Sequence, residues 1–136
     1  MFPQAVLSMN EKQTPTMDPI TFAGYSRDDV VRQFIERHMA FLAGTEVKMF
    51  LYIFVHTLGR DKQADYISLS QFLDGVVSRS GARVDHGTGC SKQAVVAATA
   101  NLESKGLIVV RRAGTPPWNG INLYAINVIE DESTDL

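Results

Sequence analysis

The sequence contains only one cysteine, Cys90, in its 136 residues. A single thiol excludes an internal disulfide framework and any zinc site built on several cysteines. Long apolar runs are also missing: the longest, near Met49–Val55, falls far short of the ~20 residues that a membrane-spanning helix needs. The chain opens without a basic segment followed by an apolar one, so we predict no secretory signal. We therefore expect a cytoplasmic protein with no membrane partner.

A strong net charge is missing too, since the formal charge is −2. A protein that coats nucleic acid without selectivity would usually be basic. The charge is nevertheless uneven along the chain. Residues 79–112 carry six basic side chains against two acidic ones, a local net charge of +4, whereas the last seven residues carry four acidic side chains and no basic one. This polarity favours an anionic partner for one part of the surface.

The length fits one domain with a single modest core. Residues 1–25 contain three prolines and show no clear period, which predicts a partly disordered N-terminal arm. We assign residues 26–128 to one folded domain and residues 129–136 to an acidic C-terminal tail.

Apolar spacing predicts four helices. The first spans Ser26–Leu42, with Ser26 as its N-cap. The second begins at Thr45 and ends at Gly59. The third is capped by Ser68 or Ser70 and the fourth spans Ser91–Ser104. The predicted inward residues of the second helix are Val47, Phe50, Leu51, Phe54, Val55 and Leu58; those of the third are Leu69, Phe72, Leu73, Val76 and Val77; those of the fourth are Ala94, Val95, Ala98 and Leu102.

Strands and loops complete the pattern. Tyr66-Ile67 is a candidate short strand, and the glycine-containing segment Ser78–Gly89 is predicted to be a loop. Leu107–Arg112 and Ile121–Val128 are rich in β-formers and are separated by turn residues, which predicts a hairpin with a long tip. The fold class is therefore α+β and mostly helical. The last five elements follow the order of a winged helix-turn-helix, with an extra N-terminal helix and a C-terminal β-hairpin wing.

The predicted fourth helix has the two faces that a DNA-reading helix requires. Opposite its apolar residues, small or polar side chains would allow the backbone to enter the major groove. Gln93 is suited to an adenine edge, and Ser91 and Lys92 at the N-terminus are suited to phosphate. The remaining outward residues are Val96, Ala97 and Ala100.

The predicted wing and the long loop supply further candidate contacts to duplex DNA. Such segments commonly lie along the phosphate backbone or in the minor groove. The candidates are Arg111, Arg112, Trp118 and Asn119 in the wing and Arg79 and Arg83 in the loop.

Four stretches within residues 26–128 carry a family resemblance: Leu42–Arg60, Tyr66–Phe72, Gly87–Val95 and Leu102–Ile108. They resemble the winged-helix N-terminal domain of phage replication protein O and related replication initiators. The resemblance implies sequence-specific origin binding during replication initiation, with a replication protein as a further partner. Bacterial transcription regulators share the Leu-Glu-x-Lys-Gly-Leu-Ile passage, so a transcriptional role is the alternative. The loop Ser78–Cys90 is longer than the tight turn often found in the family.

Two hypotheses of other classes remain. In the first, the chain is a protein-binding winged-helix module, whose first helix pairs with a partner or a second copy; a DNA-binding protein of this kind would also be expected to form a homodimer. In the second, Asp85, His86, Cys90 and Ser91 supply the residue types of a hydrolase. Sequence neighbours rarely converge into a catalytic triad, so we do not expect an enzyme. No metal site and no cofactor is predicted, because no cluster has metal-ligand spacing and Gly87–Lys92 lacks the ending of a phosphate-binding loop.

Overall fold

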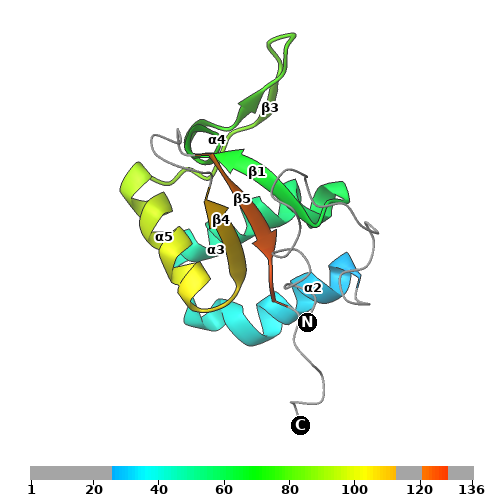
Figure 1. The fold of residues 1–136 in the computed structure, drawn as a ribbon, viewed down its shortest axis with the longest axis vertical. Helices are drawn as coiled ribbons and strands as arrows, with labels where there is room; N and C mark the ends of the chain where they lie inside the picture. The colour runs from blue at the N-terminus through cyan, green and yellow to red at the C-terminus, as the bar shows by residue number, and fades with distance from the viewer. Residues whose placement is uncertain (1–25, 113–120, 129–136) are drawn as a thin grey trace.

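A computed structural model describes residues 26–112 and 121–128 of the chain as an α+β fold. Its helices pack against one face of a small antiparallel sheet, and a separate β-hairpin projects from the body (Figure 1). The helices are α2 (Arg27–Gln33), α3 (Gly44–His56), α4 (Leu69–Asp74) and α5 (Lys92–Ser104). The strands are β1 (Ala64–Ser68), β2 (Val76–Val77), β3 (Arg83–Asp85), β4 (Ile108–Arg112) and β5 (Ile121–Ile126).

The predicted first helix is present, but it is not a uniform α-helix. Ser26 caps α2 as predicted: its hydroxyl accepts the amide of Asp29, whose carboxylate in turn accepts the amide of Ser26. After Gln33 the helix widens into a π-turn, η1 (Phe34–His38), and then tightens into a 3₁₀ turn, η2 (Met39–Phe41). The chain then reverses into α3, and the ring of Phe34 stacks on that of Phe50, with 3.8 Å between centroids.

The predicted inward face of α3 is partly wrong. Phe50 is buried, but Leu51 and Val55 are exposed, whereas Met49 and Ile53 are fully buried. Because apolar residues surround most of this helix, its sequence does not single out one face. The helix begins at Gly44, one residue before the predicted Thr45, and it ends at His56. A 3₁₀ turn, η3 (Leu58–Arg60), follows, so Gly59 does not end the helix.

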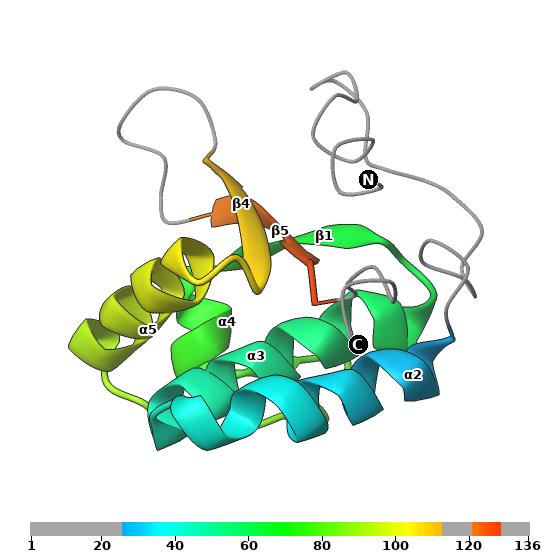
Figure 2. The ribbon, with the colours of Figure 1, turned by 90° about the horizontal axis from the view of Figure 1, so that it is seen from below.

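The sheet joins the centre of the chain to its C-terminal hairpin. Its strand order is β1-β5-β4, and both pairings are antiparallel. The strand predicted at Tyr66-Ile67 is confirmed and is longer, and both predicted hairpin strands are confirmed. Ile67, Ile108, Tyr124 and Ile126 belong to the main core under the helices. Figure 2 shows α2 and α3 side by side below this sheet.

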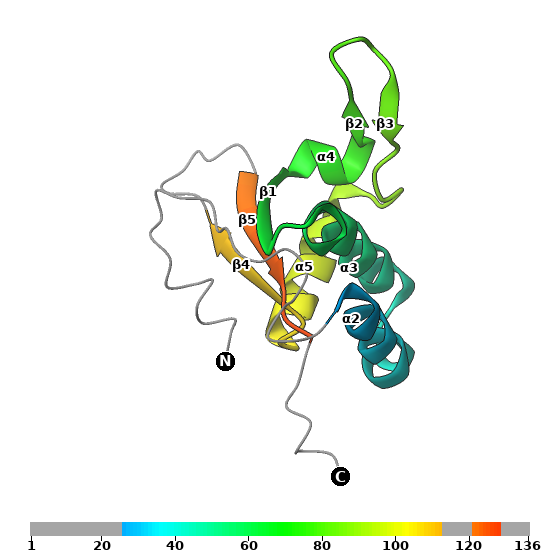
Figure 3. The same ribbon diagram turned by 90° about the vertical axis from the view of Figure 1, so that its right-hand side faces the viewer.

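The α4 region departs from the sequence prediction. Ser68, not Ser70, is the N-cap of α4, and Gln71 completes a capping box. The helix ends at Gly75, which has a φ of +85°. Val76 and Val77 were predicted to be helical and inward, but they form β2, which pairs with β3. The predicted loop Ser78–Gly89 therefore contains the second strand of a hairpin, which projects beyond α4 (Figure 3).

Two glycines at the root of this hairpin allow a close approach of two chain segments. A Cβ at Gly75 would lie 2.1 Å from the carbonyl oxygen of Asp85. Gly87 has a φ of +79°, and a Cβ there would lie 2.9 Å from the amide nitrogen of Gly75. Side chains at these positions would force the two strands apart.

The helix predicted at Ser91–Ser104 is confirmed as α5. The Ser91 hydroxyl accepts the amide of Ala94 at 3.1 Å. Gly106, with a φ of +77°, follows the helix as predicted and permits the turn into β4. Within residues 26–112 and 121–128, no helix combines the length and apolar character needed to cross a membrane.

Candidate nucleic-acid interface

Helix α5 presents one buried face and one exposed face. Val95, Ala98 and Leu102 are buried as predicted, whereas Ala94 is only half-buried. Thr99 is also buried, although the sequence did not predict it. Its hydroxyl donates to the Val95 carbonyl at 2.8 Å, so this polar group is satisfied inside the fold. The predicted outward residues are all exposed: Ser91, Lys92, Gln93, Val96, Ala97 and Ala100. The exposed face is therefore made of small, apolar and short polar side chains around one lysine.

A buried carboxylate fixes α5 against α3. Glu46 is 5% exposed, and it accepts the amide of Ala43 at 2.9 Å and the side-chain amide of Asn101 at 2.8 Å. Lys105 lies 3.8 Å from the same carboxylate. The Ala43 hydrogen bond is the largest of the influences that hold the pKa of Glu46 below its ordinary value. The ionised side chain thus ties the start of α3 to the last turns of α5, and sequence analysis missed this role.

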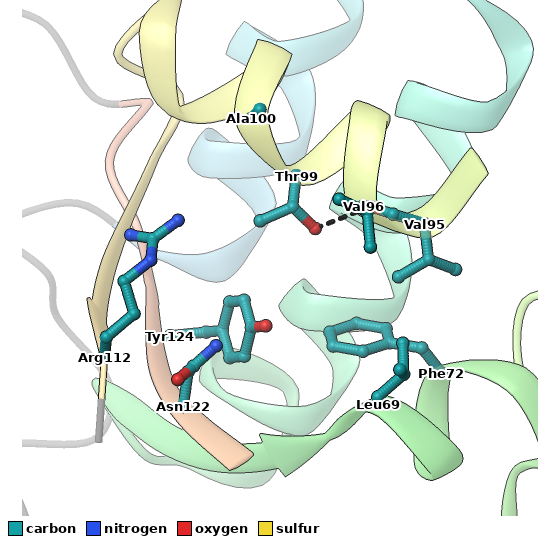
Figure 4. Close-up of a pocket in the computed structure, with 9 residues that line it drawn as sticks. All are labelled: Leu69, Phe72, Val95, Val96, Thr99, Ala100, Arg112, Asn122 and Tyr124. Atoms are coloured by element: carbon teal, nitrogen blue, oxygen red, sulfur yellow. Dashed lines mark hydrogen bonds between the residues drawn. The ribbon is translucent and has the colours of Figure 1, made fainter. Parts of the chain in front are cut away.

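A groove of about 250 Å³ lies between α5 and the sheet (Figure 4). Val96 and Ala100 of the exposed α5 face line one side, and Asn122 and Tyr124 of β5 line the other. Burial raises the pKa of the Tyr124 hydroxyl, so it is a neutral hydrogen-bonding group. The remaining lining residues are Leu69, Phe72, Val95, Thr99 and Arg112. The exposed face of α5 is therefore continuous with an apolar groove that has a polar rim.

The two arginines of β4, which the sequence analysis placed in a wing, differ in their surroundings. Arg112 makes a two-pronged ion pair with Glu103 of α5, at 2.9 and 3.0 Å. Hydrogen bonding to this carboxylate raises the pKa of Arg112. Arg111 is half-buried on the adjacent position of β4. Trp118 and Asn119, predicted at the wing tip, lie outside the described residues. The ion pair joins β4 to α5 and offsets the charge of Arg112.

The projecting hairpin carries the other two predicted arginines. Arg79 is exposed in the turn between β2 and β3. Arg83 is exposed on β3, but its guanidinium donates to the Asp74 carbonyl at 2.7 Å and to the Asp85 carbonyl at 3.2 Å. In Figure 1 the N-terminal end of α5 points toward the same end of the molecule as this hairpin. Arg79 and Lys92 therefore lie on segments that share one end of the fold.

Asp85 anchors the root of the hairpin to α3. Its carboxylate accepts the Tyr52 hydroxyl and the Gly87 amide, each at 2.9 Å, and lies 3.3 Å from Nε2 of His56. Burial acts to raise the pKa of Asp85, but the hydrogen bonds from Gly87 and Tyr52 lead the influences that hold it below its ordinary value. Burial and then Arg60 lower the pKa of His56. The carboxylate thus stays ionised beside a histidine that favours its neutral form.

This arrangement bears on the hydrolase hypothesis. The contacts of Asp85 run to Tyr52, His56 and Gly87, while His86 is exposed and the Ser91 hydroxyl serves as a helix cap. The four residue types noted in the sequence are therefore not joined by hydrogen bonds into a triad. In the two described ranges, no group of three or more histidine, cysteine or acidic residues could hold a metal ion.

Comparisons of the chain with models of protein families, with curated proteins and with solved structures find no match.

Proposed function

We propose that the protein is a winged helix-turn-helix that binds duplex DNA, with replication initiation by origin recognition as its role. The observation that carries the proposal is the exposed face of α5. Its small and short polar residues stand opposite a buried face that is locked to α3 through Glu46 and Asn101. A helix with this division can enter a groove about 12 Å wide without exposing core residues.

The arrangement of the other elements supports the winged-helix proposal. The pair α4 and α5 would be the helix-turn-helix, with the β2–β3 hairpin inserted between its helices. The strands β4 and β5 would be the wing, and β1 extends their sheet by pairing with β5. The Arg112–Glu103 ion pair would keep the wing at a fixed distance from the reading helix.

Each exposed residue of α5 then has a defined task. Gln93 would read an adenine edge, and Val96, Ala97 and Ala100 would meet thymine methyl groups. Lys92 and the amides behind Ser91 would hold a phosphate at the helix N-terminus. Arg111, with Trp118 and Asn119 at the wing tip, would contact the backbone on one side. Arg79 and Arg83 would contact it on the other.

The wider role rests on the resemblance to phage replication initiators, with a replication protein as a further partner. The transcription-regulator alternative uses the same DNA-binding surface, so it differs in the site that is recognised. Selection of a preferred sequence from random duplexes distinguishes the two roles. If the protein initiates replication, the selected sequence should occur repeatedly within a replication origin. If it is a transcription regulator, the selected sequence should occur at promoters.

The first experiment measures fluorescence anisotropy of a labelled random duplex at several salt concentrations. Binding that involves four to six phosphates should weaken with salt along a log-log slope of roughly −4 to −5. Lys92→Ala, Arg79→Ala and Arg111→Ala should each weaken binding to all sequences and flatten that slope by about 1. The control is Lys62→Ala. Lys62 lies just before β1, and this strand begins at its end farther from α5 (Figure 1).

Base reading is tested separately with Gln93→Ala. On the selected site it should cost roughly 1–3 kcal/mol, while binding to random duplex should be nearly unchanged. An equal loss on every sequence would show that Gln93 does not read bases. Absence of salt-sensitive binding by the folded wild-type protein would refute the DNA proposal as a whole.

One observation favours a second candidate, a protein-binding module. Val96 is 56% exposed beside the apolar groove, and the Glu103 carboxylate stands next to the wing. Such a surface could hold an apolar segment of a partner protein. Failure to bind DNA, together with a folded chain, would direct the search to such partners.

A further inference from the structure

An apolar face on the first two helices is separate from the proposed DNA surface. The described part of the chain has ten large hydrophobic residues that are exposed, and half of them belong to the segment from α2 to α3. These five are Ile35, Met39, Phe41, Leu51 and Val55. Phe41 is the most exposed of them, at 78%. A concentration of this kind is typical of a protein interaction site.

Helix geometry places four of these residues in one stripe. Phe34 and Phe50 face each other between the two antiparallel segments. The next residue of each, Ile35 and Leu51, is exposed, and antiparallel partners turn these positions to the same outer side. Met39 and Val55 lie one turn further along their helices. Figures 2 and 3 show that α2 and α3 run alongside each other, with the sheet on one side of the pair.

The charges beside the stripe are self-complementary. Arg32 and Glu36 are both exposed and lie four residues apart, so they share one side of the helix next to Ile35. Within its own chain, Arg32 also forms an ion pair with Asp29. A twofold axis that crosses the segment near Phe34 would set Arg32 of one copy against Glu36 of the other, and the reverse. Twofold interfaces require such a pattern, because the same surface must complement itself.

We propose that this outer face, formed by Ile35, Met39, Leu51 and Val55, binds a second copy of the same chain in an antiparallel twofold dimer. The dimer itself does not depend on the proposed DNA function. Because the face belongs to α2, η1, η2 and α3, it leaves both copies of α5 uncovered. Two copies would then present two reading helices, which suits a site made of two half-sites.

The experiment is sedimentation velocity of the full chain over a wide concentration range. The wild-type protein should form a dimer, and Ile35→Glu and Leu51→Glu should each raise its dissociation constant at least about 100-fold, because each buries an unpaired charge at the interface. Val84→Glu is the matched control, since Val84 is equally apolar and 52% exposed on β3. It should leave the dimer intact, and circular dichroism should show that all three variants remain folded.

A charge exchange tests the twofold arrangement. Arg32→Glu and Glu36→Arg should each raise the dissociation constant about tenfold, and the double variant should restore it, because opposite charges again meet across the axis. Failure of the double variant to recover, or a wild-type protein that stays monomeric at hundreds of micromolar, would overturn the proposal. A monomer that still binds DNA would refute only the dimer. A dimer that ignores DNA would refute only the proposed function.

Discussion

Replacing Asp85 by alanine should destabilise the protein by about 3 kcal/mol at neutral pH. The carboxylate accepts two hydrogen bonds, from the Tyr52 hydroxyl and the Gly87 amide. A hydrogen bond to a charged group contributes about 1.5–3 kcal/mol. The Asp85 side chain is 25% exposed, so the lower end of that range applies to each bond. Tyr52→Phe removes one of the two bonds and should cost about 1.5 kcal/mol.

The assay is urea unfolding of the wild type, both single variants and the double variant. Because the Tyr52 hydroxyl and the Asp85 carboxylate contact each other, the double variant should lose less than the sum, with a coupling of about 1 kcal/mol. Losses that add without coupling, or a loss below about 0.5 kcal/mol for Asp85→Ala, would refute the anchoring role. Val84→Ala is the control, since it changes the neighbouring, exposed position of the same strand.

Three further predictions concern the same framework. Acidification should lower the free energy of unfolding in two stages, because the folded pKa values of His56 and Asp85 lie below their ordinary values of 6.5 and 3.8. The stability that each residue contributes is present above its ordinary pKa and is lost as the pH falls through its folded pKa. Urea titrations from pH 7 to pH 3 check this, and His56→Gln should remove the first stage; a flat profile between pH 7 and pH 5 would contradict it. Glu46→Ala should cost about 3 kcal/mol, because the Ala43 amide and the Asn101 side-chain amide lose a charged acceptor. Asn101→Ala should cost less, and equal losses would argue against the Ala43 contact. Gly75→Ala should cost at least about 3 kcal/mol, because the new Cβ would clash with Asp85 and the position has a positive φ. Gly81 also has a positive φ but no neighbour within 4 Å, so Gly81→Ala should cost only about 1–2 kcal/mol. Thermal unfolding measures both losses.

Local signals in the sequence determined much of the element order. Ser26, Ser68 and Ser91 each precede a helix and cap it, because a serine hydroxyl satisfies an amide of the first turn. Gly106 marks the exit from α5, and the two β-rich runs after it pair as strands. These features depend on residues a few positions apart, so they can be read without knowing the fold.

The buried faces were harder to infer. The sequence placed Leu51 and Val55 of α3 inside, but the tertiary structure leaves them exposed, because the sheet and α5 select the face that carries Met49 and Ile53. A helix that is apolar nearly all round carries no signal for that choice. For the same reason the sequence did not predict the β2–β3 hairpin. The spacing of Val76 and Val77 continues the apolar pattern of the helix, but the helix ends before them, at Gly75.

For the candidate site, the sequence alone determined which α5 residues face outward, because a 3.6-residue period fixes opposite faces once the apolar positions are known. Only the tertiary structure decided what surrounds them. It joined Arg112 to Glu103, Asn101 to Glu46, and Asp85 to Tyr52 and His56, across separations of 9 to 55 residues. Contacts between such distant residues follow from how the helices and strands pack, and no local pattern encodes them.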